Sequence, residues 1–352
     1  MKISSLRLGL VFVVLLYVTM SLPGCASRGK VEHRPLEFTE APSPHGKDKF
    51  PNWQFPPYEL EGRLHKMLLA SEFESLGMER IGKGMTGAMI ARLFLPAEKK
   101  EIKFKFKKNV PGRLDSYNTS PRKELAAYEV QKLFLEPEDY VVPTAFPLCP
   151  TRENYMRAGQ EYAAATVKGT DCVLGLASIW RVNVEHPKKL YEESRFLKEP
   201  TYAYFMSNFN ILTYLIQHRD AREGQWLVSK DAKRRQVFSI DNGISFDFWP
   251  YNFFRRQWDV IHVPALRKDS IDRLREIQRQ DLNFLGVIAQ LELDENGILQ
   301  PKPVGENLDP HKGAMFKDGT VQFGLTKSEI DNLWRRIQAL IADVDSGKIS
   351  VF

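Results

Sequence analysis

Two aspartates follow predicted secondary-structure elements at positions that suit catalysis. Asp220 comes after an apolar stripe at helical spacing, residues 211–216, which predicts the end of a helix at residues 201–217. Asp241 follows a strand-like run at residues 237–240. Catalytic groups usually lie at the ends of such rigid elements. Phosphoryl transfer needs two carboxylates of this kind, since one accepts the proton of a substrate hydroxyl and the other holds a metal ion on the phosphates.

The residues between these aspartates predict a β-hairpin. Residues 226–228 and 237–240 are two short strands joined by a polar turn at residues 229–235. The flanking tripeptides His218-Arg219-Asp220 and Asp241-Asn242-Gly243 resemble, in this order, the catalytic loop and the metal-binding turn of kinases. The resemblance implies that Asp220 is the catalytic base and that Asp241 is a metal ligand.

The second metal ligand of a kinase catalytic loop is an Asn five residues after the base. Gln225 occupies this position and keeps the carbonyl oxygen but adds a methylene. Asp-Asn-Gly followed by Ile-Ser-Phe is more similar to the atypical kinases, which include phosphatidylinositol kinases, HipA-like kinases and the secretory-pathway casein kinase family. Alone, each tripeptide is usually structural, as a salt-bridged loop or a hairpin turn. The kinase interpretation therefore depends on both motifs together.

A glycine-rich segment lies far upstream of these motifs. Gly82, Gly84 and Gly87 form the pattern G-x-G-x-x-G, and residues 88–95 after it are strand-like. A strand–turn–strand arrangement resembles the kinase loop that covers the phosphates, which makes the three glycines candidate nucleotide-binding residues. A plain glycine hairpin is the alternative.

Residues 102–108 alternate between two faces of a predicted strand, with Lys103, Lys105 and Lys107 on one face and phenylalanines on the other. Kinases need one lysine here to contact the ATP phosphates and to pair with a helix glutamate. Atypical kinases resemble Phe-Lys followed by a turn, which favours Lys107 and leaves Lys105 as the second choice. The alternative for the remaining lysines is a solvated face.

Glu124 is the expected helix glutamate. It lies seventeen residues after Lys107, in the first turn of a helix predicted from Ser120, its expected cap, to about Phe134. The segment Glu-Leu-Ala-Ala-Tyr that begins at Glu124 is similar to the Glu-Ile-Ala-Ala-Tyr of bacterial atypical kinase-like proteins. Stabilisation of the helix dipole is the alternative role for this carboxylate.

The N-terminal residues indicate export. Residues 1–24 combine a basic start with an apolar run, which is typical of a signal peptide. Leu-Pro-Gly-Cys at residues 22–25 resembles a bacterial lipobox, which implies cleavage before Cys25 and lipidation of its thiol; an ordinary signal peptide or an uncleaved anchor is the alternative. Ala26 implies sorting to the outer membrane. We therefore expect an exported, lipid-anchored protein of the bacterial cell envelope.

Residues 25–57 carry the lipidated cysteine and a proline-rich tether, which would hold the rest of the chain off the membrane. Near the end of this tether, Trp53 and Phe55 are candidates to pack on the globular body. Export also bears on the two remaining cysteines, Cys149 and Cys172, because an oxidising compartment permits a disulfide between them. The sequence leaves open whether they are close enough to pair.

Composition limits the ligand classes. The 352 residues are 43% hydrophobic, which supports a packed core, and the net charge of +6 suits an anionic ligand or an anionic membrane surface. No nucleic-acid-binding motif accompanies this charge, so we predict no nucleic-acid partner. No His/Cys cluster indicates zinc, and no G-x-S-x-G elbow indicates a hydrolase.

The expected fold class is α+β, with a two-lobed protein-kinase-like fold. A small, β-rich nucleotide-binding lobe with one key helix would span residues 58–184, beginning with an amphipathic helix at 58–77 and ending in a pocket wall at 178–184. A mostly helical large catalytic lobe would span residues 185–352. We expect its helices at 201–217, at 270–293 and after residue 326, with a surface excursion at 294–325.

The expected function is that of a lipid-anchored atypical kinase. With Mg²⁺ or Mn²⁺, it would transfer the γ-phosphate of ATP to a hydroxyl group on a protein, a lipid or a small molecule. One alternative is a pseudokinase-like envelope or host-facing interaction lipoprotein without catalysis. A nucleotidyl transferase on the same kind of fold is the other.

Overall fold

The computed structural model describes residues 49–57, 74–81, 87–97, 99–116, 120–159, 162–189, 191–221, 223–246 and 258–352. The chain divides into two units, Met1–Arg34 and Pro35–Phe352, and every described residue belongs to the second. The predictions for Cys25, Gly82 and Gly84 lie outside the described residues, as does most of the predicted helix at 58–77. Residues 74–77 of that prediction form a strand instead of a helix.

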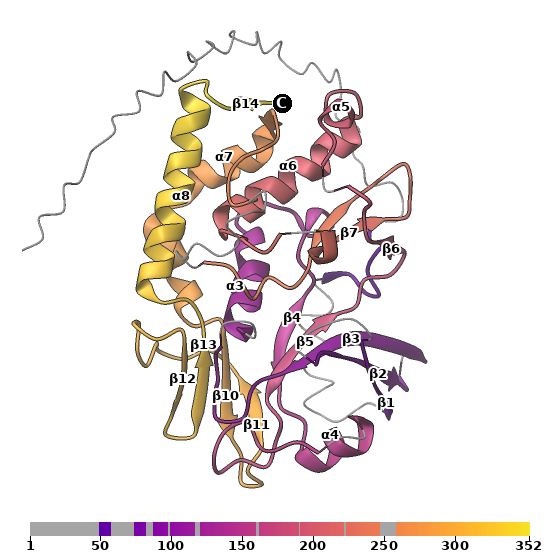
Figure 1. Ribbon diagram of the computed structural model, residues 1–352. Helices are drawn as coiled ribbons and strands as arrows, with labels where there is room; N and C mark the ends of the chain where they lie inside the picture. The colour runs from indigo at the N-terminus through magenta and orange to yellow at the C-terminus, as the bar shows by residue number, and fades with distance from the viewer. Residues whose placement is uncertain are drawn as a thin grey trace, which may run out of the picture. The chain divides into compact units, whose positions relative to one another are not determined.

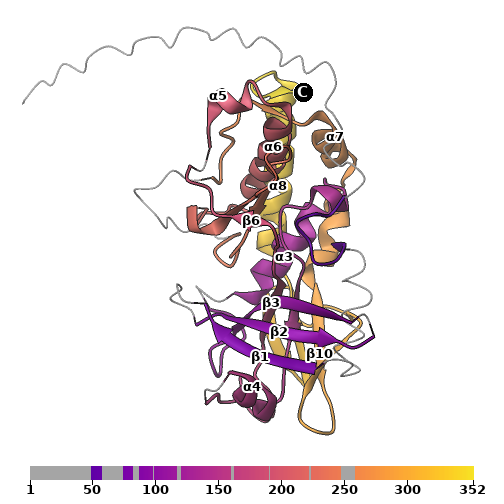
Figure 2. The same cartoon turned by 90° about the vertical axis from the view of Figure 1, so that its right-hand side faces the viewer.

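The chain is a mixed α+β protein in which an N-terminal antiparallel sheet is followed by helices (Figure 1). Five antiparallel strands form this first sheet in the order β1-β2-β3-β5-β4. Their bounds are β1 Glu74–Arg80, β2 Met89–Leu95, β3 Lys100–Lys108, β4 Ala145–Leu148 and β5 Gly175–Ile179. Figure 2 shows β1, β2 and β3 side by side, with helix α4 (Arg152–Gly159) near β1.

Strand β3 has the alternation that its sequence predicts. Ile102, Phe104 and Phe106 are buried in a cluster with residues of β2 and β5, whereas the lysines occupy the opposite face. Because β3 lies in the middle of the sheet, with β2 and β5 as its neighbours, its lysine face has a fixed position relative to β5 and to the chain that follows β5.

Helix α3 (Pro121–Gln131) follows β3 in the chain and contacts β4 and α6 (Pro200–Leu215). Pro121 occupies the first turn as expected. The predicted capping role of the Ser120 side chain is wrong, because its buried hydroxyl accepts no bond from the helix and has no partner among the described residues. Leu125 and Tyr128 are both buried, in two different apolar clusters.

The segments after β5 build the helical part and a small three-stranded sheet in the order β6-β7-β8. Their bounds are β6 Val184–Glu185, α5 Glu193–Phe196, α6, η3 Glu223–Gln225, β7 Trp226–Ser229, β8 Val237–Ser239, β9 Ala265–Leu266, α7 Lys268–Glu276, η4 Arg279–Gly286, α8 Lys327–Asp345 and β14 Ser350–Val351, with η2 Pro137–Asp139 preceding β4. The hairpin of β7 and β8 agrees with the sequence prediction. Helix α8 begins with a capping box between Thr326 and Glu329, at the helix start expected after residue 326.

The aromatic residues at the two ends of segment 246–258 are core residues. Phe246 and Trp258 are both buried, and the ring centroids of Trp258 and Trp226 are 4.8 Å apart with a steep interplanar angle. Such tilted pairs are favoured over face-to-face stacking. The residues between them, 247–257, lie outside the described part of the chain.

The prediction for residues 270–325 is wrong in two places. The expected helices end at Gly286, and residues 289–293 form a strand. The expected surface excursion contributes three strands to a second antiparallel sheet, in the order β11-β10-β13-β12. Its bounds are β10 Ala289–Leu293, β11 Leu299–Lys302, β12 Ala314–Lys317 and β13 Thr320–Phe323. These strands are four or five residues long and their turns are rich in Gly and Asp, so the turn residues dominate the composition.

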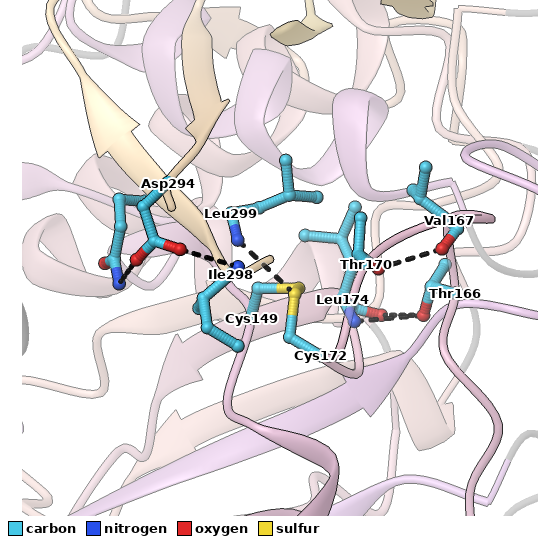
Figure 3. The surroundings of a disulfide bond; sticks show 10 residues. Cys149, Thr166, Val167, Thr170, Cys172, Leu174, Asp294, Ile298 and Leu299 are labelled. Atoms are coloured by element: carbon cyan, nitrogen blue, oxygen red, sulfur yellow. Dashed lines mark hydrogen bonds between the residues drawn. A yellow bond between two sulfur atoms is a disulfide. The ribbon is translucent and has the colours of Figure 1, made fainter. Parts of the chain in front are cut away.

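The second sheet packs on a disulfide. Cys149 and Cys172 are bonded, with Cα atoms 5.3 Å apart, which settles a pairing that the sequence left open (Figure 3). The sulfur of Cys172 accepts a hydrogen bond from the backbone of Leu299 at 3.5 Å, and Leu291 and Phe323 belong to the same buried cluster. The bond is consistent with an extracytoplasmic location. Within the described residues, no helix is both long and apolar enough to cross a membrane.

Replacing both cysteines by alanine should lower the free energy of unfolding by about 3 kcal/mol, because the bond closes a loop between residues 23 positions apart. Urea unfolding of the oxidised protein, of the reduced protein and of the Cys149→Ala/Cys172→Ala variant measures this. The reduced wild type should match the variant. Equal stability of the oxidised protein and the variant would contradict a structural role for the bond.

Candidate functional site

A cavity of about 490 Å³ is lined by three of the candidate site residues, Lys105, Glu124 and Asp241. Its wall is formed by β3, by the segment at residues 178–186 and by the chain around β7 and β8. The lining residues are Lys103, Lys105, Glu124, Val142, Pro143, Ser178, Ile179, Trp180, Arg181, Val182, Asn183, Val184, Glu185, His186, Leu227, Ile240 and Asp241. The wall segment expected at residues 178–184 is therefore part of this cavity.

A second, smaller cavity of about 250 Å³ contains none of the predicted site residues. Its charged side chains are paired with one another, as in the ion pairs of Arg267 with Asp139 at 2.8 Å and of Lys49 with Glu138 at 2.8 Å. Charged side chains that are already paired with one another have less to gain from binding a charged ligand. The larger cavity is therefore the candidate site.

Asp241 is held by two of the three lysines of β3. The ammonium group of Lys107 donates to Oδ1 of Asp241 at 3.1 Å, and that of Lys105 lies 3.4 Å from the same oxygen. Lys103 instead forms an ion pair with Glu101 at 3.6 Å. Alternation along β3 places all three lysines on one face, but only the two nearer its C-terminal end reach Asp241.

The two lysines differ in exposure. The side chain of Lys105 is 21% exposed and lines the cavity, whereas that of Lys107 is only 7% exposed and is not among the described lining residues. The preference for Lys107 as the phosphate-contacting lysine thus stays a prediction, and the structure gives Lys105 the more accessible ammonium group.

Asp241 has an unusual backbone conformation and a shifted pKa. Its φ of +61° lies in the left-handed region, which non-glycine residues rarely adopt and which is enriched at functional sites. Burial alone would raise the pKa of this carboxyl, but the charges and hydrogen bonds of Lys105 and Lys107 outweigh it and hold the pKa far below its ordinary value. Asp241 is therefore a carboxylate at any physiological pH.

Glu124 lies beside this group in the first turn of α3. Burial raises the pKa of its carboxyl and the charge of Asp241 raises it further, while Lys105, Lys107 and a hydrogen bond from the backbone of Asn242 oppose the shift. Within the described residues the ion pair of Lys107 is with Asp241, so a direct pair between Lys107 and Glu124 stays a prediction.

The site combines two ammonium groups, those of Lys105 and Lys107, with the carboxyl groups of Asp241 and Glu124. Charges that are partly withdrawn from water interact more strongly than charges on the surface. An anionic group entering the cavity would meet the ammonium group of Lys105, which is the more accessible of the two.

Asp220 and Gln225 lie next to this cluster, but neither is among the described residues that line the cavity. The side-chain amide of Gln225 donates to Oδ2 of Asp220 at 3.1 Å. The backbone N–H of Ile240, the residue before Asp241, donates to the carbonyl oxygen of Gln225 at 3.0 Å. The structure thus connects the loop that carries Asp220 and Gln225 to the turn at Asp241.

Of the three candidate loop glycines, only Gly87 is described. It has a φ of +64° and is exposed. Strands β1 and β2 pair on either side of this loop, and the backbone N–H of Ile81 donates to the carbonyl of Ala88. The predicted strand–turn–strand frame is therefore present, and the role of the glycines in binding stays a prediction.

Arg122 fixes the position of the first turn of α3, which carries Glu124. Its guanidinium group donates to Oδ2 of Asp115 at 2.6 Å and to Oε2 of Glu329 at 2.7 Å. Glu329 belongs to the capping box of α8. Two elements far apart in the chain thereby set the position of Glu124, and neither Arg122 nor Glu329 was identified from the sequence as part of this arrangement.

Comparison with known proteins adds no assignment. No protein-family model matches the chain, and a search of curated proteins finds no significant relative.

The burial of His218 predicts how the stability of the folded protein depends on pH. The imidazole is fully buried, and burial lowers its pKa to about 4, from 6.5 in an unfolded chain. Between these values the unfolded state binds one more proton, so stability is complete above pH 6.5 and falls as the pH drops towards 4. The wild type should lose up to about 3 kcal/mol through this group, and His218→Asn should not.

The measurement is urea unfolding at several pH values between 4 and 7 for the wild type and for His218→Asn. The difference between the two curves isolates His218, because the remaining carboxyl groups are common to both proteins. Parallel curves across this range would show that the imidazole does not titrate differently on folding.

Proposed function

We propose that this protein is an ATP-dependent phosphotransferase with a two-lobed, protein-kinase-like fold. One observation carries the proposal: Lys105, Glu124 and Asp241 line one cavity, and Lys107 forms an ion pair with Asp241. A lysine, a helix glutamate and an acidic turn are the groups that kinases use to orient the phosphates. The strand order of the first sheet, with α3 inserted between β3 and β4, is compatible with a small lobe of this kind.

The cavity lining combines two chemically different kinds of surface. Val142, Ile179, Leu227 and Ile240 supply apolar surface, which suits a flat heterocyclic ring. Lys105 and Asp241 supply charged groups, which suit phosphates and their counter-ion. ATP has both parts, and a cavity of about 490 Å³ lies in the range of small-molecule sites.

The donor atoms fit a divalent metal ion that is held mainly by the nucleotide. Within the described residues no group of three His, Cys, Asp or Glu side chains forms a metal site. Mg²⁺ keeps several waters and needs only one or two carboxylates beside substrate phosphates, so Asp241 would be its main protein ligand and Gln225 the second proposed one. Mg²⁺ or Mn²⁺ would neutralise charge on the phosphates when bound.

Asp220 would act as the base. Its carboxylate takes the proton of the acceptor hydroxyl while that oxygen forms a bond to the γ-phosphorus and the bond between this phosphorus and the bridging oxygen breaks, leaving ADP. The acceptor belongs to a protein, a lipid or a small molecule. Lys105 and Lys107 would hold the phosphates in place during this displacement.

A second candidate is a nucleotide-binding module without catalysis. The observation that favours it is the hydrogen bond from the Gln225 amide to Asp220, which occupies one oxygen of the only proposed base. A phosphotransferase must break or tolerate this contact when the acceptor binds.

We further propose that the protein acts in the cell envelope, exported and anchored by a lipid on Cys25 in the outer membrane. The disulfide between Cys149 and Cys172 supports an oxidising location. The anchor itself lies outside the described residues.

Replacing the base should separate catalysis from binding. Asp220→Asn should lower the turnover of ATP by about a hundredfold or more, because general-base catalysis contributes this much, while ATP affinity stays within about twofold. Turnover is measured as ADP release with Mg²⁺ or Mn²⁺. Asp231→Asn is the matched control, since Asp231 is an exposed turn residue of the β7–β8 hairpin.

Equal turnover by the wild type and Asp220→Asn would contradict the assigned role of Asp220. ATP binding without any turnover by the wild type would instead support the second candidate, the non-catalytic module.

A further inference from the structure

The part of the predicted tether that the structure describes is hydrogen-bonded to the cavity wall. Residues 49–57, here called the strap, are hydrogen-bonded to the segment at residues 180–183, which also lines the cavity. The sequence assigned these residues to the end of a spacer, with Trp53 and Phe55 as candidates to pack on the globular body. Their hydrogen bonds indicate a more specific role.

Asn52 pairs with the wall through backbone and side chain. The backbone N–H of Val182 donates to the carbonyl of Asn52 at 3.2 Å, and the Asn52 side-chain amide donates to the carbonyls of Val182 at 3.1 Å and Asn183 at 3.0 Å. Asn52 is 1% exposed. Three bonds to two successive residues fix the path of the wall at this point, since buried bonds of this kind are costly to leave unmade.

Gln54 joins β3 to the same wall. Its side-chain amide donates to the carbonyls of Lys103 at 2.6 Å and Trp180 at 2.8 Å, and its side-chain oxygen accepts from the backbone of Lys103 at 2.7 Å. One side chain thus bridges the two strands where the pairing of β3 with β5 ends. Lys103 lies two residues before Lys105 on the same face of β3, so the bridge also helps to fix the position of these lysines.

Trp53 covers a buried cation of the wall. The guanidinium carbon of Arg181 lies 3.1 Å from the ring centroid of Trp53 and 4.4 Å from that of Phe238. No nitrogen of this guanidinium group has a hydrogen-bond partner within the described residues. Contacts with aromatic faces partly offset the free-energy cost of burying the charge. Because Trp53 belongs to the strap, part of this stabilisation of Arg181 comes from the strap.

We propose that the strap is a positioning element for the cavity, coupled to ligand binding. Asn52, Trp53 and Gln54 hold residues 180–183 in the conformation that completes the wall. By thermodynamic reciprocity, a ligand that binds this wall must then stabilise the strap by the same factor by which the strap improves its affinity. The part of the proposal that concerns ligand affinity rests on the proposed function, whereas the positioning of the wall does not.

A test without ligand uses amide hydrogen exchange. Gln54→Ala should speed exchange in residues 180–183 by about fivefold or more, because three bonds to the strand ends are lost. Lys49→Ala is the matched control, since its ammonium group pairs with Glu138 at 2.8 Å, away from the wall. Unchanged exchange in Gln54→Ala would overturn the positioning role.

A second arm uses ATP with Mg²⁺ as the probe. In the wild type, ATP should slow exchange in residues 51–54, and Gln54→Ala should raise the Kd and KM for ATP by about fivefold or more with little change in kcat. ATP affinity unchanged in a variant with faster wall exchange would overturn the coupling. A wild type that binds no ATP would refute the proposed function, and the exchange arm alone would then decide the role of the strap.

Discussion

The position of Asp241 between two lysines is the interaction on which the candidate site depends. One carboxylate oxygen lies 3.1 Å from the Lys107 ammonium and 3.4 Å from that of Lys105. A partly buried carboxylate without these partners would be driven towards protonation. The lysines of β3 therefore keep it charged, and Asp241 itself has a left-handed backbone with a φ of +61°. Lys105 also lines the cavity, so its ammonium group is accessible to an anion.

The scaffold around this cluster comes from segments that are far apart in the chain. Helix α3 contributes Tyr128 to the cluster that holds the helices together and Leu125 to the one around the disulfide. Arg122 ties the first turn of the same helix to Asp115 and to the start of α8. Glu124 is therefore held by packing and ion pairs on several sides, as preorganisation of a functional group requires.

Local patterns in the sequence predicted much of this arrangement. The lysine–phenylalanine alternation of β3, the hairpin before Asp241 and the capping box at Thr326 and Glu329 are encoded within a few residues, and each agrees with the structure. The second sheet was not predicted, because its strands are short and its buried side chains, such as Leu291 and Val321, are explained only by the disulfide cluster opposite. Contacts such as Gln54 with Trp180 or Arg122 with Glu329 join residues more than a hundred positions apart and leave no local signal.

The central claim is that the lysine–aspartate cluster binds the phosphates of a metal nucleotide. The most direct measurement is thermal unfolding of residues 26–352 with and without ATP and Mg²⁺ or Mn²⁺, for the wild type and for Asp241→Asn. The account predicts metal-dependent stabilisation of the wild type, about 2.7 kcal/mol at a hundred times the dissociation constant, and its loss in the variant. No stabilisation of the wild type by either metal nucleotide, or an equal effect on Asp241→Asn, would contradict it.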